Sequence, residues 1–434
     1  MGATAALGGM LFGFDVGIIT GAGTFLEQRF NLGPLALGGA FSSLLFGCVV
    51  GSAIAGWLAD RFGRRSPLLG VAVLFAASSI AAGLAPSFSF FIIARVLGGL
   101  AVGAESALTP MYVAEVSPRR LRGRMGTLYQ LAIVVGILVS YCVNYGFRDF
   151  GAWNWRCMFL TGAIPAVLFW FMVWGIPESP RYLMLKGRRE EAAAVLYRWL
   201  PAHGVETEIS EIEASTRKPS VGWRELLKTD IRRPLRIGFA LAILVHFSGI
   251  NTVVDYAPRI LVSAGWTIDA ALFSTFGIGL TMFLFTFVSF WVIDRHGRKP
   301  LYVVGSLGMA TALLGLAVAA ATNSFAGGKV FALVIIYIAF FSSCIGPVFW
   351  TLIPEIFPNR VRGEAMAVPV ITQWIANACV VLLFPIAFYY AGKTVTFGFL
   401  ATVALMQAWF TWKFVPETKG QSLEEIERRM RQRG

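Results

Sequence analysis

Twelve long apolar stretches constrain the fold of this 434-residue chain more than any other feature of its sequence. A transmembrane helix needs about 20 apolar residues, and within a bilayer such a stretch must be helical because its backbone polar groups find no water. Hydrophobic residues make up 56% of the chain and charged residues 14%, which excludes an ordinary soluble domain. The sequence predicts an all-α membrane protein with twelve transmembrane helices, at residues 4–26, 37–59, 67–85, 89–113, 126–147, 157–176, 236–262, 271–293, 301–322, 330–353, 364–390 and 395–414.

The net charge of +13 is distributed over alternate loops rather than gathered in one patch. Lys and Arg cluster after the second, fourth, eighth and tenth spans, in residues 177–235 and in the C-terminal tail. This alternation follows the positive-inside rule and argues against a nucleic-acid partner. We expect both termini and the 177–235 segment to be cytoplasmic, which requires an even number of spans. The first span has no basic leader and contains an acid, so we interpret it as a true span and not as a cleaved signal.

Loop motifs recur at an offset near 240 residues. DRFGRR, which begins at Asp60, recurs as DRHGRK from Asp294, and PES from Pro177 recurs as PET from Pro416. Parallel repeats of this kind place a substrate site between the two halves, near the bilayer midplane. We expect an N-terminal six-helix bundle, a cytoplasmic helical linker, a C-terminal six-helix bundle and a cytoplasmic tail, at residues 1–176, 177–235, 236–414 and 415–434.

Helical periodicity within the linker predicts two to four short helices, with candidates at 189–200, 207–218 and 221–230, and a tail helix begins at Ser422. Glycine and proline residues interrupt three spans of the second half. Broken helices free backbone groups that can line a cavity, so we expect these spans to move and to contact substrate. The interrupting residues are Gly249, Pro258, Gly346, Pro347 and Pro369.

One acid, Asp15, lies near the middle of the first span. An ionised side chain at bilayer depth costs at least ~2.5–3.5 kcal/mol, so it faces a cavity or a partner. Burial favours the protonated acid and a neighbouring cation favours the ionised one. A contact with Arg95, the only basic residue that we place within the membrane, would therefore make proton binding depend on conformation. The alternatives are a static buried pair and a polar residue that only fixes helix packing.

Acids and arginines recur together where the spans meet the cytoplasm. Isolated surface ion pairs contribute little, but a network that exists in one state can bias a conformational equilibrium. The positive-inside rule alone would explain the excess of arginine at these positions. It would not explain the acids that repeat together with the arginines. We predict a charge network in two copies: Asp60, Arg61, Arg64, Arg65, Glu115, Arg122 and Glu178, and then Asp294, Arg295, Arg298, Glu355, Arg362 and Glu417.

Several spans also contain amide and tryptophan side chains. Amides offer a donor and an acceptor together, which suits the hydroxyls of a polyol, and tryptophan offers an apolar platform for a sugar. Any one of these residues is more often a packing residue, so the prediction depends on the set: Gln130, Asn251, Trp350, Gln373, Trp374 and Asn377. The five cysteines lie within or at the edge of spans and predict no disulfide framework.

These loop signatures resemble those of the major facilitator superfamily, and six motifs resemble those of its sugar porter family: RVLGG from Arg95, PESPRYL from Pro177, GINTVVDYAP from Gly249, GPVFW from Gly346, PEIFPNRVRG from Pro354 and PETKG from Pro416. The resemblance covers nearly the whole chain. It implies two six-helix bundles that alternate access to a central monosaccharide site. It also implies that Asp15 is the coupling acid of proton symporters, with Arg95 as its partner, where facilitators carry Asn. The sugar-contact positions that it matches are Gln130, Ile137, Asn251, Trp350, Gln373, Trp374 and Asn377.

The chain departs from the family pattern in the second half. Val245 and His246 replace two glutamines that bind sugar in the family, and Met282 stands where an asparagine is usual. The extracellular gate of the family contains a pair of tyrosines. This chain has Asp255 and Tyr256 at those positions. His246 can contact a hydroxyl, recognise a carboxylate, titrate or bond to a neighbouring helix, and Asp255 can pair with Arg259 one turn on.

The sequence therefore predicts a proton-coupled monosaccharide symporter of a bacterial inner membrane, monomeric, with the proton as coupling ion and no other cofactor, metal or enzymatic activity. A cyclitol, polyol or sugar-acid symporter and an uncoupled sugar facilitator are the alternatives. A drug antiporter is disfavoured because residues 127–145 lack proline. A sugar sensor is disfavoured because the tail after Pro416 is short.

Overall fold

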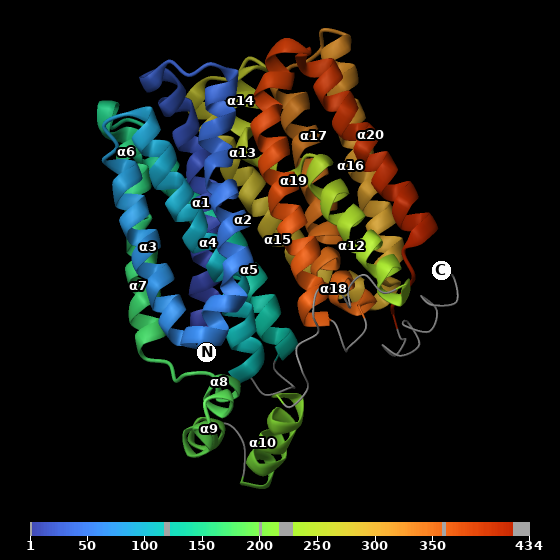
Figure 1. Cartoon of the computed structure of the whole chain (residues 1–434). Coiled ribbons are helices and arrows are strands. Elements are labelled where there is room, and N and C mark those ends of the chain that lie inside the picture. Colours follow the sequence, from blue (N-terminus) through green and yellow to red (C-terminus); the bar gives the residue numbers. More distant parts are fainter. Residues whose placement is uncertain (1, 117–121, 199–201, 217–228, 358–361, 420–434) are drawn as a thin grey trace. The chain divides into compact units, whose positions relative to one another are not determined.

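The computed structural model describes residues 2–116, 122–198, 202–216, 229–357 and 362–419, and every regular element within them is a helix (Figure 1). Twelve helical segments of the described residues are long and apolar enough to cross a membrane, which confirms the predicted all-α membrane fold. Their positions follow the twelve predicted spans. Hydropathy predicts them well because each must carry a long apolar surface.

The chain divides into two compact units that do not follow the order of the sequence. Unit 1 comprises residues 1–15, 46–137 and 156–220, and unit 2 comprises residues 16–45, 138–155 and 221–434. Several long helices therefore contribute their two ends to different units. The predicted boundaries at 176, 235 and 414 remain a prediction.

Unit 1 is built from long helices that approach each other closely. It contains residues of α1 (Gly2–Phe30), α2 (Pro34–Phe62), α3 (Arg65–Gly83), α4 (Phe88–Val116), α5 (Arg122–Phe147), α6 (Asn154–Thr161) and α7 (Ala163–Trp174). Gly47 and Gly51 of α2 lie against the backbone of α4, and Gly13 of α1 lies against the backbone of α5. A side chain at any of these positions would overlap the facing helix, as expected where membrane helices pack through small residues.

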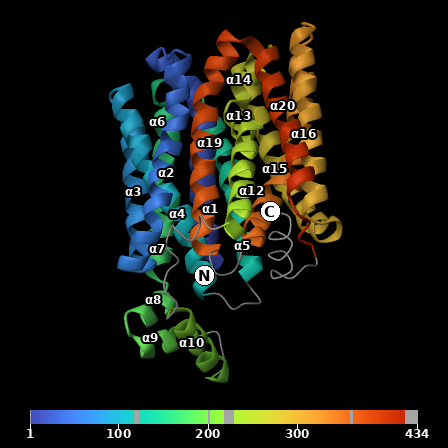
Figure 2. The same ribbon diagram turned by 45° about the vertical axis from the view of Figure 1, so that its right-hand side comes forward.

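Three short helices follow α7: α8 (Pro180–Leu185), α9 (Arg189–Leu196) and α10 (Ala202–Thr216). They lie beyond the long helices of unit 1, at the end where α1 begins (Figures 1 and 2). Leu196, Val205 and Ile209 form a small core between α9 and α10. Both helices lie where periodicity predicts them, whereas most of the predicted 221–230 helix and the tail helix from Ser422 lie outside the described residues.

Unit 2 contains the remaining elements and two interrupted spans. The first runs through α12 (Thr229–Phe247), α13 (Ile250–Asp255) and α14 (Ala257–Val262), and the second through α17 (Gly327–Phe340), a π-helical turn η3 (Phe341–Ile345) and α18 (Gly346–Ile356). The uninterrupted helices are α15 (Ile268–His296), α16 (Arg298–Ala321), α19 (Arg362–Tyr390) and α20 (Gly392–Phe414).

The predicted interruption at Pro369 is wrong. Helix α19 continues through both Pro369 and Pro385. A proline removes one backbone donor, but its fixed φ is compatible with a helix, and neighbouring groups in a membrane protein can satisfy the freed carbonyl. The breaks at Gly249 and before Gly346 are present. Gly249 has φ +96°, and the Tyr337 hydroxyl donates to the carbonyl oxygen of Ser248 at 3.0 Å.

Gly249→Ala is expected to destabilise the protein more than Gly265→Ala does. Both glycines have a positive φ, +96° and +93°, which costs an L-residue roughly 1–2 kcal/mol. A methyl group at Gly249 would also meet Cδ1 of Leu400 at 2.8 Å, whereas nothing lies within 4 Å at Gly265. Thermal unfolding of the purified variants measures the difference. Equal losses would contradict a steric contribution from Leu400.

Candidate functional site

Asp15 of α1 and Arg95 of α4 form a buried ion pair within unit 1. Nη1 of Arg95 donates to Oδ1 of Asp15 at 2.6 Å, and the two residues are 4% and 3% exposed. The guanidinium also lies over the ring of Phe159, 5.2 Å from its centroid. The Asp15 side chain thus contacts one cation within the buried interior of unit 1.

The pair leaves hydrogen-bonding capacity unused on both side chains. Oδ2 of Asp15 and both Nε and Nη2 of Arg95 are buried with no hydrogen-bond partner among the described residues. Mutual attraction offsets the desolvation of two buried charges only if further hydrogen bonds complete the geometry. Among the described residues, a single hydrogen bond thus joins the two side chains, and three of their polar atoms have no partner.

A charge network closes around Arg64 in unit 1. Nη2 of Arg64 pairs with Glu115 at 2.7 Å, and the backbone amides of Arg64 and Arg65 donate to Glu178 at 2.8 and 3.3 Å. The Ser179 hydroxyl donates to Glu115 at 2.5 Å. The network thus joins the α2–α3 turn, the end of α4 and the segment before α8.

The same arrangement recurs in unit 2 around Arg298. Its guanidinium pairs with Glu355 at 3.2 Å, its backbone amide donates to Glu417 at 3.0 Å, and the Thr418 hydroxyl donates to Glu355 at 2.5 Å. Each position matches its counterpart in unit 1 at the repeat offset seen in the sequence. Each copy closes within its own unit, and its role in conformational change remains a prediction.

Other predicted members of the network are placed differently. Asp60 and Arg61 are exposed, and Arg61 lies over the Trp57 ring, 5.6 Å from its centroid. Arg65 donates to the Trp174 carbonyl oxygen at 2.5 Å, and Arg295 lies over the Trp291 ring at 4.0 Å. The side chains of three further members lie outside the described residues: Arg122, Asp294 and Arg362.

The second-half substrate candidates gather at the break between α12 and α13. Nδ1 of His246 lies 3.3 Å from Oδ1 of Asn251, and the turn at Gly249 brings the two side chains together. Three further candidates, Gln373, Trp374 and Asn377, are buried on α19. Oδ1 of Asn377 is buried and has no hydrogen-bond partner among the described residues.

The remaining substrate candidates lie on other helices. Trp350 of α18 is 44% exposed and packs edge-on against Phe349. Gln130 and Ile137 lie on α5 in unit 1. That all of these residues serve one sugar site remains a prediction.

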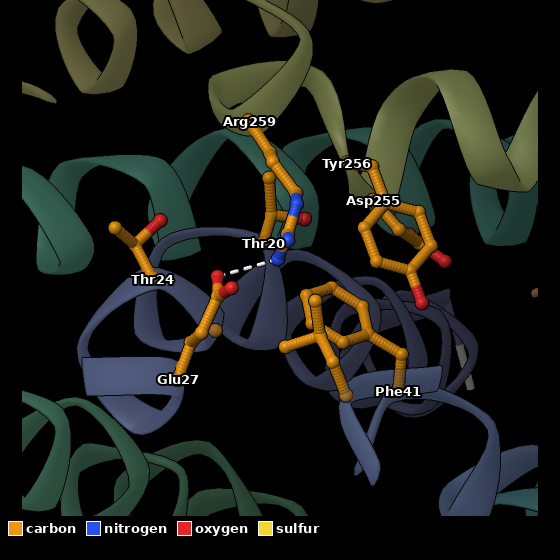
Figure 3. Close-up of a pocket in the computed structure, with 9 residues that line it drawn as sticks. Thr20, Thr24, Glu27, Phe41, Asp255, Tyr256 and Arg259 are labelled. Atoms are coloured by element: carbon orange, nitrogen blue, oxygen red, sulfur yellow. Dashed lines mark hydrogen bonds and ion pairs between the residues drawn. The ribbon is translucent and has the colours of Figure 1, made fainter. Parts of the chain in front are cut away.

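A small cavity in unit 2 lies between α1 and the α13–α14 junction (Figure 3). Glu27 of α1 and Arg259 of α14 point toward each other across it and form an ion pair. Its other lining residues are Thr20, Gly23, Thr24, Leu37, Phe41, Asp255 and Tyr256.

Tyr256 forms the apolar wall of this cavity. Its ring stacks between Phe41, at 4.3 Å between centroids, and Phe384, at 5.1 Å. Its hydroxyl donates to the carbonyl oxygen of Val381 at 3.0 Å. The tyrosine of the predicted gate is thus fixed on three sides, and Asp255 is buried beside it.

Two buried or half-buried acids were not among the sequence candidates. Glu27 near the end of α1 is the ion-pair partner of Arg259. Glu105 of α4 is 1% exposed and accepts a hydrogen bond from the Tyr129 hydroxyl at 3.1 Å. An acid within an apolar span was the available signal for Glu105, whereas nothing in the sequence linked Glu27 to Arg259.

Comparison with known proteins identifies the family. A family model described as sugar (and other) transporter matches residues 1–430. The D-xylose transporter of Levilactobacillus brevis is 38% identical over 98% of this chain and 94% of its own length. The chain belongs to the sugar porter family of the major facilitator superfamily.

Further relatives of this sugar porter share its length and fold. The D-xylose-proton symporter of Escherichia coli K12 is 37% identical over 98% of this chain and 94% of its own. The solved structure of the inward open conformation of the xylose transporter XylE from E. coli has a TM-score of 0.86 and 34% identity, and the match covers 98% of each chain. As a member of this family, the protein moves a solute rather than catalysing a reaction.

Proposed function

We propose that this sugar porter couples the entry of a proton to the uptake of a monosaccharide, a hexose or a pentose, by alternating access. The observation that carries the proposal is the buried ion pair of Asp15 with Arg95. In the state with the pair formed, the cation favours the carboxylate and proton release. In a state with Arg95 withdrawn, the buried carboxyl favours its protonated form. Relatives named as a D-xylose transporter and a D-xylose-proton symporter support this assignment.

Transport by the purified protein in liposomes tests the proposal. An inwardly directed proton gradient should drive labelled xylose or glucose above its equilibrium level, and a protonophore should abolish the accumulation. Uptake that only equilibrates and ignores the gradient would instead identify an uncoupled facilitator.

The substrate class depends on the polar side chains at the break between α12 and α13. His246 beside Asn251 gives this chain a group that can contact either a hydroxyl or a carboxylate. A cyclitol, another polyol or a sugar acid is therefore the alternative substrate. Thermal-shift measurements with a panel of sugars, polyols and sugar acids would rank these classes, because a ligand raises the stability of the state that binds it.

We also propose a monomer in a bacterial inner membrane, with both termini cytoplasmic and no cofactor besides the proton. In this orientation the end of α1 and the α13–α14 junction face the extracellular side. The pair of Glu27 with Arg259 and the stacked Tyr256 then form an extracellular gate within unit 2.

Glu27→Gln is expected to raise extracellular access to this cavity several-fold while changing stability by less than about 1 kcal/mol, because the pair is one-third exposed. The measurement is the labelling rate of Thr24→Cys by a membrane-impermeant maleimide, after the native cysteines are replaced. Swapping the charges, Glu27→Arg with Arg259→Glu, should restore slow labelling. Asp269→Asn, which removes an exposed partner of Arg148, is the control and should have no effect. Unchanged labelling in Glu27→Gln would contradict the gate.

A further inference from the structure

Glu105 is a second buried acid of unit 1, and the mechanism above does not use it. It lies on α4, ten residues after Arg95, and is 1% exposed. No Lys, Arg or His side chain described in the structure lies within 4.0 Å of its carboxyl oxygens. An ionised carboxylate buried without a cation costs several kcal/mol, so this site is built for the neutral acid.

The two carboxyl oxygens of Glu105 differ in their hydrogen bonds. Oε2 accepts a hydrogen bond from the Tyr129 hydroxyl at 3.1 Å. Oε1 and the hydroxyl of Thr109 both adjoin Gly8 of α1, and neither has a hydrogen-bond partner among the described residues. A proton on Oε1 would be donated to the Thr109 hydroxyl and would satisfy both atoms. Among the described side chains, the titratable neighbours are Tyr129 from α5 and none from α1, where Gly8 has no side chain.

Glu105 and the ion pair lie along the same contact between α1 and α4. Asp15 follows Gly8 by two helical turns, which is about 10 Å along the helix axis, and it therefore lies on the same face of α1. Arg95 contacts Asp15, and Glu105 contacts Gly8. The two acids therefore lie at two positions along the same interface between α1 and α4. Asp15 is paired with a cation, whereas Glu105 is not.

We propose that Glu105 is a second proton-binding site, which holds the proton that Asp15 releases when Arg95 pairs with it. One proton leaves the Asp15 carboxyl and one binds the Glu105 carboxylate, so the net charge of unit 1 is unchanged by the step. In the proposed orientation Glu105 lies on the cytoplasmic side of the pair and is the site from which the proton leaves. Proton coupling by Asp15 is the part of this inference that rests on the proposed function.

Infrared difference spectroscopy of the purified full chain across a pH titration tests the site directly. The carbonyl-stretch band of a protonated carboxylic acid should be present in the wild-type protein, absent in Glu105→Gln and retained in Asp15→Asn. Tyr129→Phe, which removes the hydrogen bond to the carbonyl oxygen but keeps the acid, should shift the band. A band that is unchanged in both Glu105→Gln and Tyr129→Phe would overturn the site.

Transport measurements test the transfer step. Uphill uptake by Glu105→Gln is expected to be slowed at least tenfold, with sugar counterflow near the wild-type rate. Loss of the infrared band with unchanged uphill uptake would overturn transfer from Asp15. Failure of the wild-type protein to accumulate sugar would refute proton coupling itself, and the infrared band would still decide whether Glu105 binds a proton.

Discussion

Asp15→Asn is expected to abolish sugar accumulation while counterflow continues near the wild-type rate. The amide has nearly the size of the acid and can still accept a hydrogen bond from Arg95, but it does not bind and release a proton as a carboxyl group does. A gradient of one pH unit supplies about 1.4 kcal/mol, which sustains at most a tenfold accumulation at one proton per sugar. The wild-type protein should approach that ratio in liposomes, and Asp15→Asn should not exceed equality.

Two controls make this result specific to the buried pair. Asp149→Asn removes an acid that is 71% exposed and should accumulate sugar as the wild-type protein does. Asp15→Asn leaves the guanidinium of Arg95 without its anion, so its stability must be measured, because removing one partner of a buried pair typically costs about 3–5 kcal/mol. Accumulation that survives in a folded Asp15→Asn protein would refute the coupling role.

Arg64→Met is expected to destabilise the protein by about 3–5 kcal/mol, since Glu115 would be left buried without its cation. The side chains of this pair are 4% and 10% exposed. Arg298→Met breaks the corresponding pair in unit 2, whose side chains are 19% and 25% exposed, and it should cost clearly less. The two variants thus remove the same kind of Arg–Glu ion pair at two degrees of burial. Thermal unfolding in detergent provides the measurement.

A double variant distinguishes two contributions to the loss of stability: the lost attraction between Arg64 and Glu115, and the cost of leaving the Glu115 carboxylate unpaired. Arg64→Met with Glu115→Gln removes both charges and should recover part of the stability lost in Arg64→Met alone. Equal losses in the single and the double variant would show that the bond of Arg64 to the Ala59 carbonyl oxygen, 3.0 Å long, accounts for the effect instead.

The spans and the contact of Asp15 with Arg95 were accessible from the sequence for simple reasons. A transmembrane helix must be long and apolar wherever it lies in the bundle, so hydropathy reveals it without knowledge of its neighbours. Charges within such helices are few, which leaves few possible partners. The interruption at Gly249 was predictable because a glycine among apolar residues tolerates a left-handed backbone.

The other features depend on neighbours that no local pattern reveals. Glu27 and Arg259 are far apart in the chain, and only the packing of α1 against α14 makes them partners. Pro369 resembles a helix break in sequence, yet α19 tolerates it. Glu105 is an acid within the glycine-rich α4 but was not among the sequence candidates. Its distinguishing property, that Tyr129 contacts it and no described cation does, depends on packing.

The contact between Gly8 and Glu105 has an evolutionary consequence. A methyl group at Gly8 would overlap Oε1 of Glu105 and would lie 3.0 Å from the Thr109 hydroxyl oxygen, so a larger residue at position 8 would displace the carboxyl from its present place. Lineages of this transporter in which position 8 acquires a larger residue should therefore have lost the acid at position 105 first. The two positions should change together, with the acid confined to sequences that keep glycine.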